Sequence, residues 1–243
     1  MNVLVTGFPA GAFAANCYLV APAPGEECVI IDPGQDAERG IEELTSRYRL
    51  KPVAVLLTHG HIDHVWSVGP VCGAKGIPAY IHPGDRAMMA NPGAGMDLMA
   101  RQQFFGGMTF TEPDDVKELA DGEVIPLAGL EFTVGHTPGH TLGSVTFRSG
   151  ANSSSGDGSG DNSGGDEAEI DALFAGDLLF AGSIGRTDLP GGDHATMLRS
   201  LARTLTLPDT TVVLPGHGPA TTIGDERQTN PFLTGIRPAQ KGL

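Results

Sequence analysis

Three histidines and an aspartate crowd into the stretch LLTHGHIDHV at positions 56–65, directly after an apolar run. The whole chain has 8 histidines, so this concentration calls for a chemical reason. A solvated loop gains nothing from the crowding, and a packed core would have to satisfy every ring nitrogen. A metal ion can instead be bound by imidazole and carboxylate groups together. If strand geometry persists briefly, His59 and His61 point the same way and can share one ion, whereas Asp63 and His64 diverge and can bind a second.

Metal-binding residue types also follow three other apolar runs that have the character of strands. These runs and the residues after them are LEFTVG (130–135) with His136 and His140, DALFAG (171–176) with Asp177, and TVVLPG (211–216) with His217. In sheets covered by helices, ligands bind at the carboxyl ends of strands, so we expect these side chains to meet in one site. Histidine and carboxylate ligands suit zinc, iron or manganese. Two ions about 3.5–4 Å apart need a bridging carboxylate, and Asp177 is the natural candidate.

Short strands and amphipathic helices must hold these residues in place. The expected strands are apolar and β-branched runs between Gly and Pro turns, at 2–7, 17–22, 28–33, 53–57, 79–83, 123–129, 130–135, 144–149, 171–176 and 211–216. Helices are expected after the N-cap candidate Asp36, from about Val65, and after the N-cap candidate Asp193. The stretch 88–108, rich in Met and Gly, is expected to be helix and loop.

The segment 149–171 differs from the rest of the chain. It consists almost entirely of Gly, Ser, Asn and acidic residues, and it has no Lys or Arg. Such a composition cannot bury enough apolar surface to offset the entropy lost on ordering. We therefore predict one domain over 1–243 that contains a disordered acidic Gly/Ser insertion at 149–171, between two strands.

Composition excludes several classes of protein. The net charge of −14, with no basic stripe, opposes binding to nucleic acid. No run approaches the 18 or so apolar residues of a membrane span, and the first 38 residues lack the basic residues of a signal peptide. The cysteines are few, odd in number and without C-x-x-C spacing, which favours reduced thiols in a cytoplasmic protein. The oligomeric state is not specified by the sequence.

The motif set resembles that of the metallo-β-lactamase superfamily, from the first strand to about Phe232. The set comprises H-x-H-x-D-H (59–64), TPGHT (137–141), AGDLLF (175–180) and PGHGP (215–219). The resemblance implies an α/β fold, an αββα sandwich of two facing mixed β-sheets flanked by helices, with the metal site at one edge. It implies two divalent ions, with zinc expected first and iron or manganese as alternatives. The implied ligands are His59, His61 and His140 for the first ion, Asp63, His64 and His217 for the second, and Asp177 as the bridge, with a hydroxide between the ions.

Finer motifs resemble those of glyoxalase II-like hydrolases. The most familiar class of β-lactamases has cysteine at the position of Asp177, and the strings GRTDLPGGD (185–193) and PATTIGDERQTNPF (219–232) resemble short bacterial glyoxalase II-like members. That resemblance implies hydrolysis of a small-molecule thioester of the S-lactoyl-thiol type, with Asp63 and Asp177 as catalytic residues. The longer enzymes grip glutathione with a C-terminal helical domain, so weaker glutathione specificity is expected here. GRTD also occurs in mononuclear iron persulfide dioxygenases, which are the alternative, together with a lactonase or esterase on the same site.

Other polar residues have less specific interpretations. His136 is expected to be structural or to support a ligand, and His82 and His194 to be surface or cap residues. Thr58, Thr137 or Asp188 can orient the metal-binding histidines. Arg186 can bind substrate or pair with a nearby acidic residue, and the sequence does not decide between these two roles.

Overall fold

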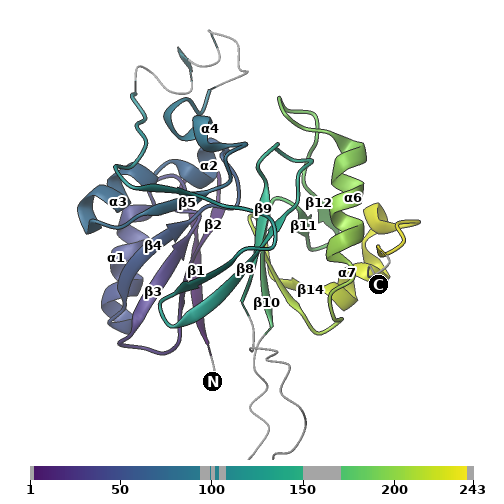
Figure 1. Ribbon diagram of the computed structural model, residues 1–243, viewed down its shortest axis with the longest axis horizontal. Coiled ribbons are helices and arrows are strands. Elements are labelled where there is room, and N and C mark those ends of the chain that lie inside the picture. The colour runs from purple at the N-terminus through teal and green to yellow at the C-terminus, as the bar shows by residue number, and fades with distance from the viewer. Residues whose placement is uncertain (1–2, 94–98, 100–101, 104–107, 150–170, 240–243) are drawn as a thin grey trace, which may run out of the picture.

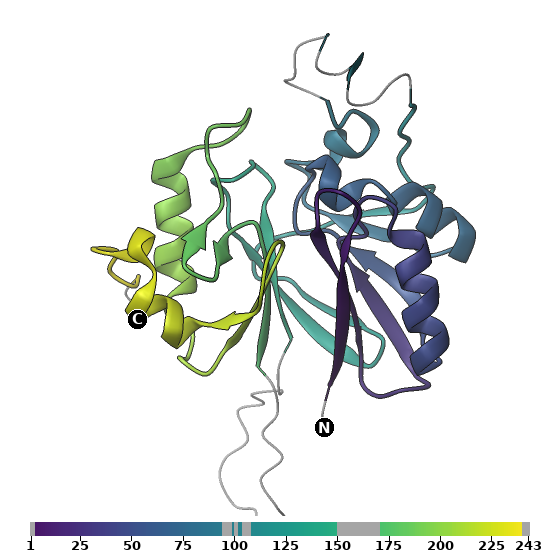
Figure 2. The same cartoon turned by 180° about the vertical axis from the view of Figure 1, so that it is seen from behind.

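Two β-sheets stand face to face in the middle of the molecule, and helices cover the outer face of each sheet (Figures 1 and 2). The computed structural model describes residues 3–93, 99, 102–103, 108–149 and 171–239. The arrangement confirms the predicted αββα sandwich of two mixed sheets.

The first sheet comes from the N-terminal half of the chain. Its six strands follow chain order: β1 (Leu4–Ala10), β2 (Ala15–Ala21), β3 (Glu27–Ile31), β4 (Lys51–Leu56), β5 (Ala79–Ile81) and β6 (Val116–Glu118). Strands β1 to β3 pair antiparallel, whereas β3 to β6 pair parallel. Parallel neighbours need crossover connections, here α1 (Ala37–Tyr48), then α2 (Ile62–Val65) with α3 (Val68–Lys75), and then a connection that includes α4 (Arg86–Ala90). The carboxyl ends of β3 and β4 therefore lie at the same edge.

The second sheet comes from the C-terminal half. Its order is β14 (Thr221–Thr222), β13 (Val212–Pro215), β10 (Ala172–Gly176), β9 (Val145–Ser149), β8 (Leu130–His136) and β7 (Val124–Leu127). Only β10 and β13 pair parallel among these described strands, and α6 (His194–Thr204) crosses between them after a small hairpin of β11 (Leu179–Phe180) and β12 (Ser183–Ile184). Helix α7 (Ile223–Thr229) and a 3₁₀ helix (Pro231–Leu233) follow. The residues after β10 and β13 thus emerge side by side.

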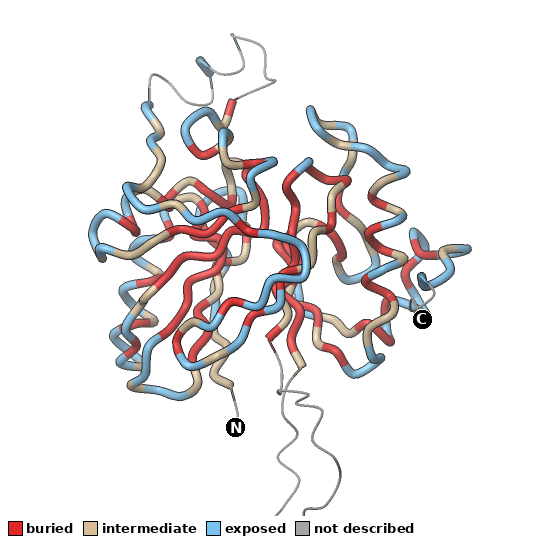
Figure 3. Tube along the Cα trace, viewed as in Figure 1, coloured by how far each residue is buried: buried red, intermediate tan, exposed pale blue. Residues whose placement is uncertain are grey.

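Alternating strand side chains build three buried apolar layers. In β3, Val29 and Ile31 belong to the layer between the sheets, whereas Cys28 and Ile30 pack with residues of α1 and α3. A third layer lies between the second sheet and α6, and includes Leu173 and Leu201. Figure 3 shows that buried positions follow the strands. Strands β3 and β10, which lead into the site, are therefore packed on both faces.

The two predicted N-caps behave differently. Asp193 caps α6, because its carboxylate accepts a hydrogen bond from the backbone N–H of Thr196 at 2.7 Å. Asp36 occupies the N-cap position of α1 in the left-handed region, and its side chain makes no capping hydrogen bond. Asp36 thus lies at the predicted N-cap position of α1 without the side-chain hydrogen bond that usually accompanies it.

Several other expectations need adjustment. The helix expected from about Val65 is present as two short pieces, α2 and α3, and the short strands β6 and β14 were not predicted. The predicted insertion at 149–171 falls almost wholly on residues 150–170, which lie outside the described residues. Its flanking strands β9 and β10 pair antiparallel, with Ser149 opposite Ala172. Within the described ranges, no helix is long and apolar enough to cross a membrane.

Candidate metal centre

Loops that follow four strands bring all seven predicted ligands to one edge of the two sheets. His59 and His61 follow β4, Asp63 and His64 lie in α2, His140 lies between β8 and β9, and Asp177 and His217 follow β10 and β13. Their candidate ligand atoms form three overlapping groups, and within each group these atoms lie within 4.8 Å of one another. The groups are His59–His61–His140, His59–His64–Asp177 and Asp63–His64–His217.

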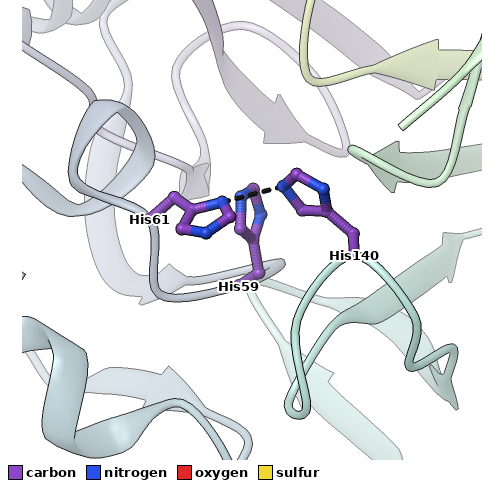
Figure 4. A group of neighbouring side chains, drawn as sticks. All are labelled: His59, His61 and His140. Atoms are coloured by element: carbon purple, nitrogen blue, oxygen red, sulfur yellow. Dashed lines mark hydrogen bonds between the residues drawn. The ribbon is translucent and has the colours of Figure 1, made fainter. Parts of the chain in front are cut away.

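The first group, here named the histidine cluster, consists of His59, His61 and His140 (Figure 4). The Nδ1 atom of His61 lies 2.8 Å from Nε2 of His140. The ring of His59 stands 4.9 Å from that of His61 and 4.8 Å from that of His140, centroid to centroid. His59 and His140 are buried. Three imidazoles from two loops thus converge on one point.

The second group, here named the mixed cluster, consists of Asp63, His64 and His217. Oδ2 of Asp63 lies 3.2 Å from Nε2 of His217 and 3.7 Å from Nε2 of His64. Asp177 reaches both clusters: its Oδ1 lies 3.4 Å from Nε2 of His64, and its Oδ2 lies 3.5 Å from Nε2 of His140. Its two oxygens therefore face one residue of each cluster, as a bridging carboxylate requires.

Hydrogen bonds fix the orientation of three of the histidines. The hydroxyl of Thr58 donates to Oδ2 of Asp32 at 2.6 Å, so its oxygen accepts from Nδ1 of His59 at 3.1 Å. Nδ1 of His64 donates to Oδ2 of Asp32 at 3.0 Å, and Nδ1 of His140 donates to the backbone carbonyl of Arg186 at 2.8 Å. With Nδ1 occupied, each ring has Nε2 facing the centre, which is the nitrogen that can bind a metal.

Asp32 is a functional residue that the sequence reasoning missed. It is buried at the end of β3, in the left-handed region, and it accepts the backbone N–H of Thr58 as well as the two bonds above. The sequence CVIIDP indicates this role, because it places an acidic residue just past a buried strand, as at the four strands that precede the clustered residues.

Burial controls protonation in the histidine cluster. Burial, followed by the neighbouring histidines, lowers the pKa of His59 well below its usual value. Burial and the adjacent His140 lower the pKa of His61 to about 4. Both rings are therefore neutral at physiological pH, as metal ligands must be.

Carboxylates reverse this effect in the mixed cluster. Burial alone would lower the pKa of His64, but Asp177 and Asp63 outweigh it and raise that pKa well above its usual value. The hydrogen bond to Asp63 raises the pKa of His217. The acidic groups thus favour positive charge at this point, and a divalent cation satisfies the same demand.

Unpartnered buried atoms test whether the residues fit a metal. Across the described residues, three buried side-chain atoms have no hydrogen-bond partner: Nε2 of His59, Nε2 of His64 and Oδ1 of Asp177. Leaving a buried polar atom unpaired costs about 1–3 kcal/mol, so such atoms call for an explanation. All three belong to the overlapping groups and all three are metal-ligating atom types. The site therefore fits divalent cations.

The remaining predicted residues lie outside the two clusters. Nε2 of His136 donates to the backbone carbonyl of Leu142, and its ring stacks on that of His82 at 4.1 Å between centroids. Thr137 bonds Ser144 rather than a histidine, and Asp188 forms a bidentate pair with Arg186. Of the three proposed orienting residues only Thr58 contacts a clustered histidine through its side chain.

Comparison with known proteins identifies the family. A family model described as the metallo-β-lactamase superfamily matches residues 10–169 and 155–217. The chain belongs to the metallo-β-lactamase superfamily. It is accordingly a metallo-hydrolase of that superfamily, with histidine and aspartate clusters suited to divalent metal ions.

Relatives of this superfamily member match it over most of its length. Uncharacterized protein Rv2581c of Mycobacterium tuberculosis (strain ATCC 25618 / H37Rv) is 48% identical over 236 residues, which are 96% of this chain and 99% of the relative. Hydroxyacylglutathione hydrolase GloC of Haemophilus influenzae is 34% identical over 241 residues, 96% of this chain and 98% of the relative.

Two solved structures resemble the metallo-hydrolase closely. The BLEG-1 B3 metallo-β-lactamase has a TM-score of 0.76 and 37% identity, and the match covers 96% of this chain and 100% of that one. TTHA1623 in a di-iron-bound form has a TM-score of 0.71 and 39% identity, with 94% and 100% covered.

Proposed function

We propose that this metallo-hydrolase binds two divalent ions, zinc being expected first, and cleaves small-molecule thioesters of the S-lactoyl-thiol type. The observation that carries the proposal is the pair of adjacent clusters joined by Asp177, with ligating atoms of both left without protein partners. The relative GloC, described as a hydroxyacylglutathione hydrolase and similar over nearly its whole length, supports the thioester class.

The proposed ligands are those of the two clusters. His59, His61 and His140 would hold one ion, Asp63, His64 and His217 the other, and Asp177 would contact both. Bound divalent cations would supply Lewis acidity, which lowers the pKa of water toward about 7 and stabilises negative charge on a carbonyl oxygen.

Asp63 is the carboxylate best placed to orient a water molecule. Burial would raise its pKa, but His64 and His217 outweigh burial and hold that pKa well below its usual range. Asp63 is therefore a carboxylate at neutral pH, and its side chain is 21% exposed, against 12% for Asp177. It can accept a hydrogen bond from the attacking water and orient it toward a substrate carbonyl.

Substrate is expected to approach past His217. The side chain of His217 is 31% exposed, whereas His59 and His64 are almost fully buried. The ring of Phe180 stands edge-on to that of His217, 6.3 Å away, and offers an apolar wall beside the open side. The net charge of −14 argues for an uncharged or small substrate rather than nucleic acid.

A cytoplasmic location completes the proposal. Cys17, Cys28 and Cys72 are all buried and unpaired. Burial raises the pKa of Cys28 and of Cys72 to about 12, so these thiols are inert core residues of the kind found in reducing compartments.

The test combines metal analysis with substrate assays on the purified protein. After reconstitution we expect two ions per chain and turnover of lactoyl thioesters of glutathione and of smaller thiols. Asp63→Asn should lose that turnover, whereas Asp36→Asn is the matched control, because Asp36 is exposed and makes no capping bond. A single iron per chain with oxygen consumption on a thiol persulfide would replace the proposal with the dioxygenase.

Hydrolysis of β-lactams is a second candidate, because the BLEG-1 structure is described as a B3 metallo-β-lactamase and matches at 37% identity. Turnover of a chromogenic cephalosporin, measured beside the thioesters, distinguishes β-lactam hydrolysis from thioester hydrolysis. Faster turnover of the cephalosporin than of every thioester would favour the lactamase.

A further inference from the structure

Asp85 is a buried carboxylate at the start of α4 that does not cap its own helix. Only 1% of the residue is exposed, and although it occupies the N-cap position, its side chain makes no capping bond. Its oxygens instead accept three hydrogen bonds from other segments. The donors are the N–H of Gly60 to Oδ2 at 2.9 Å, the hydroxyl of Thr141 to Oδ2 at 2.5 Å, and the N–H of Gly143 to Oδ1 at 2.7 Å.

The three donors belong to the two loops that build the histidine cluster. Gly60 lies between His59 and His61, and Thr141 directly follows His140. One carboxylate therefore joins the loop after β4, on the first sheet, to the loop between β8 and β9, on the second sheet. Because His61 and His140 lie in these two loops, the separation of the loops determines the separation of the two histidines. The facing nitrogens of His61 and His140 are 2.8 Å apart.

Two glycines allow the loops to press against Asp85. A Cβ atom on Gly143 would lie 2.6 Å from N of Asp85 and 2.7 Å from its Cγ. A Cβ atom on Gly60 would lie 2.8 Å from Cβ of Met88 and 2.9 Å from O of Asp85. Real side chains do not approach so closely, so both loops depend on glycine to reach this carboxylate.

We propose that Asp85 is a positioning residue that sets the separation of the two loops and thereby the affinity of the ion in the histidine cluster. The inference rests on the proposed function, since it assumes that His59, His61 and His140 bind an ion. Metal–ligand distances tolerate only about 0.2 Å, so a cluster built from two sheets needs a fixed link between its halves. Asp85 has no comparable bond to the mixed cluster within the described structure.

The primary test is Asp85→Asn, with zinc affinity as the readout. All three partners of Asp85 are donors, so the amide nitrogen of asparagine must face at least one of them and weaken the link. Glu226→Gln is the matched control: Glu226 is 2% exposed and also accepts three bonds, from Gly182, Thr221 and Asn230, away from the two loops. The two variants should lose similar thermal stability.

The zinc affinity of each cluster is measured separately by disabling the other cluster with a substitution. His217→Ala weakens the mixed cluster and leaves the histidine cluster, whereas His61→Ala does the reverse. Competition with a chromophoric chelator then measures zinc affinity in each background. We expect Asp85→Asn to lower affinity by about tenfold or more in the His217→Ala background and by less than about twofold in the His61→Ala background. Glu226→Gln should change neither.

A second pair of variants keeps the test decisive if Asp85→Asn does not fold. Thr141→Val removes the hydroxyl donor, and Thr141→Ser retains it, so only the valine variant should lose zinc affinity at the histidine cluster. Unchanged affinity in both Asp85→Asn and Thr141→Val, or an equal loss in the two backgrounds, would overturn the positioning role. Absence of zinc binding by the wild-type protein would instead overturn the proposed function.

Discussion

The histidine cluster and the mixed cluster lie side by side, yet different forces govern them. The histidine cluster has no carboxylate of its own; His59 and His140 are buried, and burial keeps His59 and His61 neutral. The mixed cluster is partly exposed, and carboxylates raise the pKa of His64 and His217. We infer that the first cluster is a preformed anchor and that the second is where protons and substrate exchange.

Asp177 is the one described residue whose carboxylate reaches both clusters, so removing it gives the largest expected effect. Asp177→Ala should lower turnover by more than about a hundredfold and lower the occupancy of at least one ion, because losing a supporting partner alone costs about 10–100-fold. Kinetics and metal analysis on the same preparation check this, with circular dichroism as the test of fold. Turnover close to wild type would remove Asp177 from the bridging role.

The pKa directions predict that acid removes the two ions in order. A ligand must lose its proton to bind metal, so below a raised pKa each unit of pH costs about tenfold in affinity per proton. His64 and His217 have raised pKa values, so acid competes with a metal for these two rings first. His61, with a pKa of about 4, binds a proton only in far more acidic solution.

Lowering the pH from 7 to 5 should therefore weaken binding at the mixed cluster by about a hundredfold or more, and weaken it more there than at the histidine cluster, where the pKa values of His59 and His61 are lowered. Metal content after gel filtration at each pH gives the measurement, and the His61→Ala and His217→Ala variants identify which ion leaves. Simultaneous loss of both ions would mean that the clusters do not differ in the way their electrostatics imply.

Asp32 supports one histidine in each cluster. Asp32 orients His64 with its side chain and His59 through Thr58, whereas His140 is oriented by a backbone carbonyl. Asp32→Asn should lower metal affinity by about 10–100-fold, since the amide can present only one acceptor oxygen to three donors. Asparagine tolerates the left-handed backbone at this position, so strain is not added.

Asp32→Asn is assayed by chelator competition, with Asp36→Asn as its control, because Asp36 shares the left-handed backbone without bonding the site. Equal affinity in both variants would show that Asp32 is a packing residue only.

The sequence predicted the clustered residues better than the residues that support them, for a physical reason. Histidines and acids after apolar runs are a local pattern, so all seven clustered residues were found from spacing and the family resemblance. Asp85 could not be found this way, because the sequence HPGD before a helix is typical of a turn and an N-cap. The residues that donate to Asp85 are also distant in sequence, by 25, 56 and 58 positions. Strand β6, with the polar sequence VKE, carries no apolar signal and is defined only by its neighbour β5.

Arg186 provides the smallest expected effect and the sharpest contrast with Asp32. The sequence left open whether Arg186 binds substrate or pairs with an acid; its guanidinium pairs with Asp188 at 2.7 Å, and both side chains are largely exposed. What reaches the metal centre is its backbone carbonyl, which accepts from His140. A substitution removes the side chain and keeps the carbonyl, so Arg186→Ala should leave the zinc affinity of both clusters unchanged. The exposed pair contributes little to stability, because solvent and salt screen it.

Measuring zinc affinity together with KM separates the remaining possibilities for Arg186. A higher KM with intact metal binding would assign the guanidinium to substrate binding. Lost zinc affinity would mean that the side chain, and not the carbonyl alone, holds the loop behind His140.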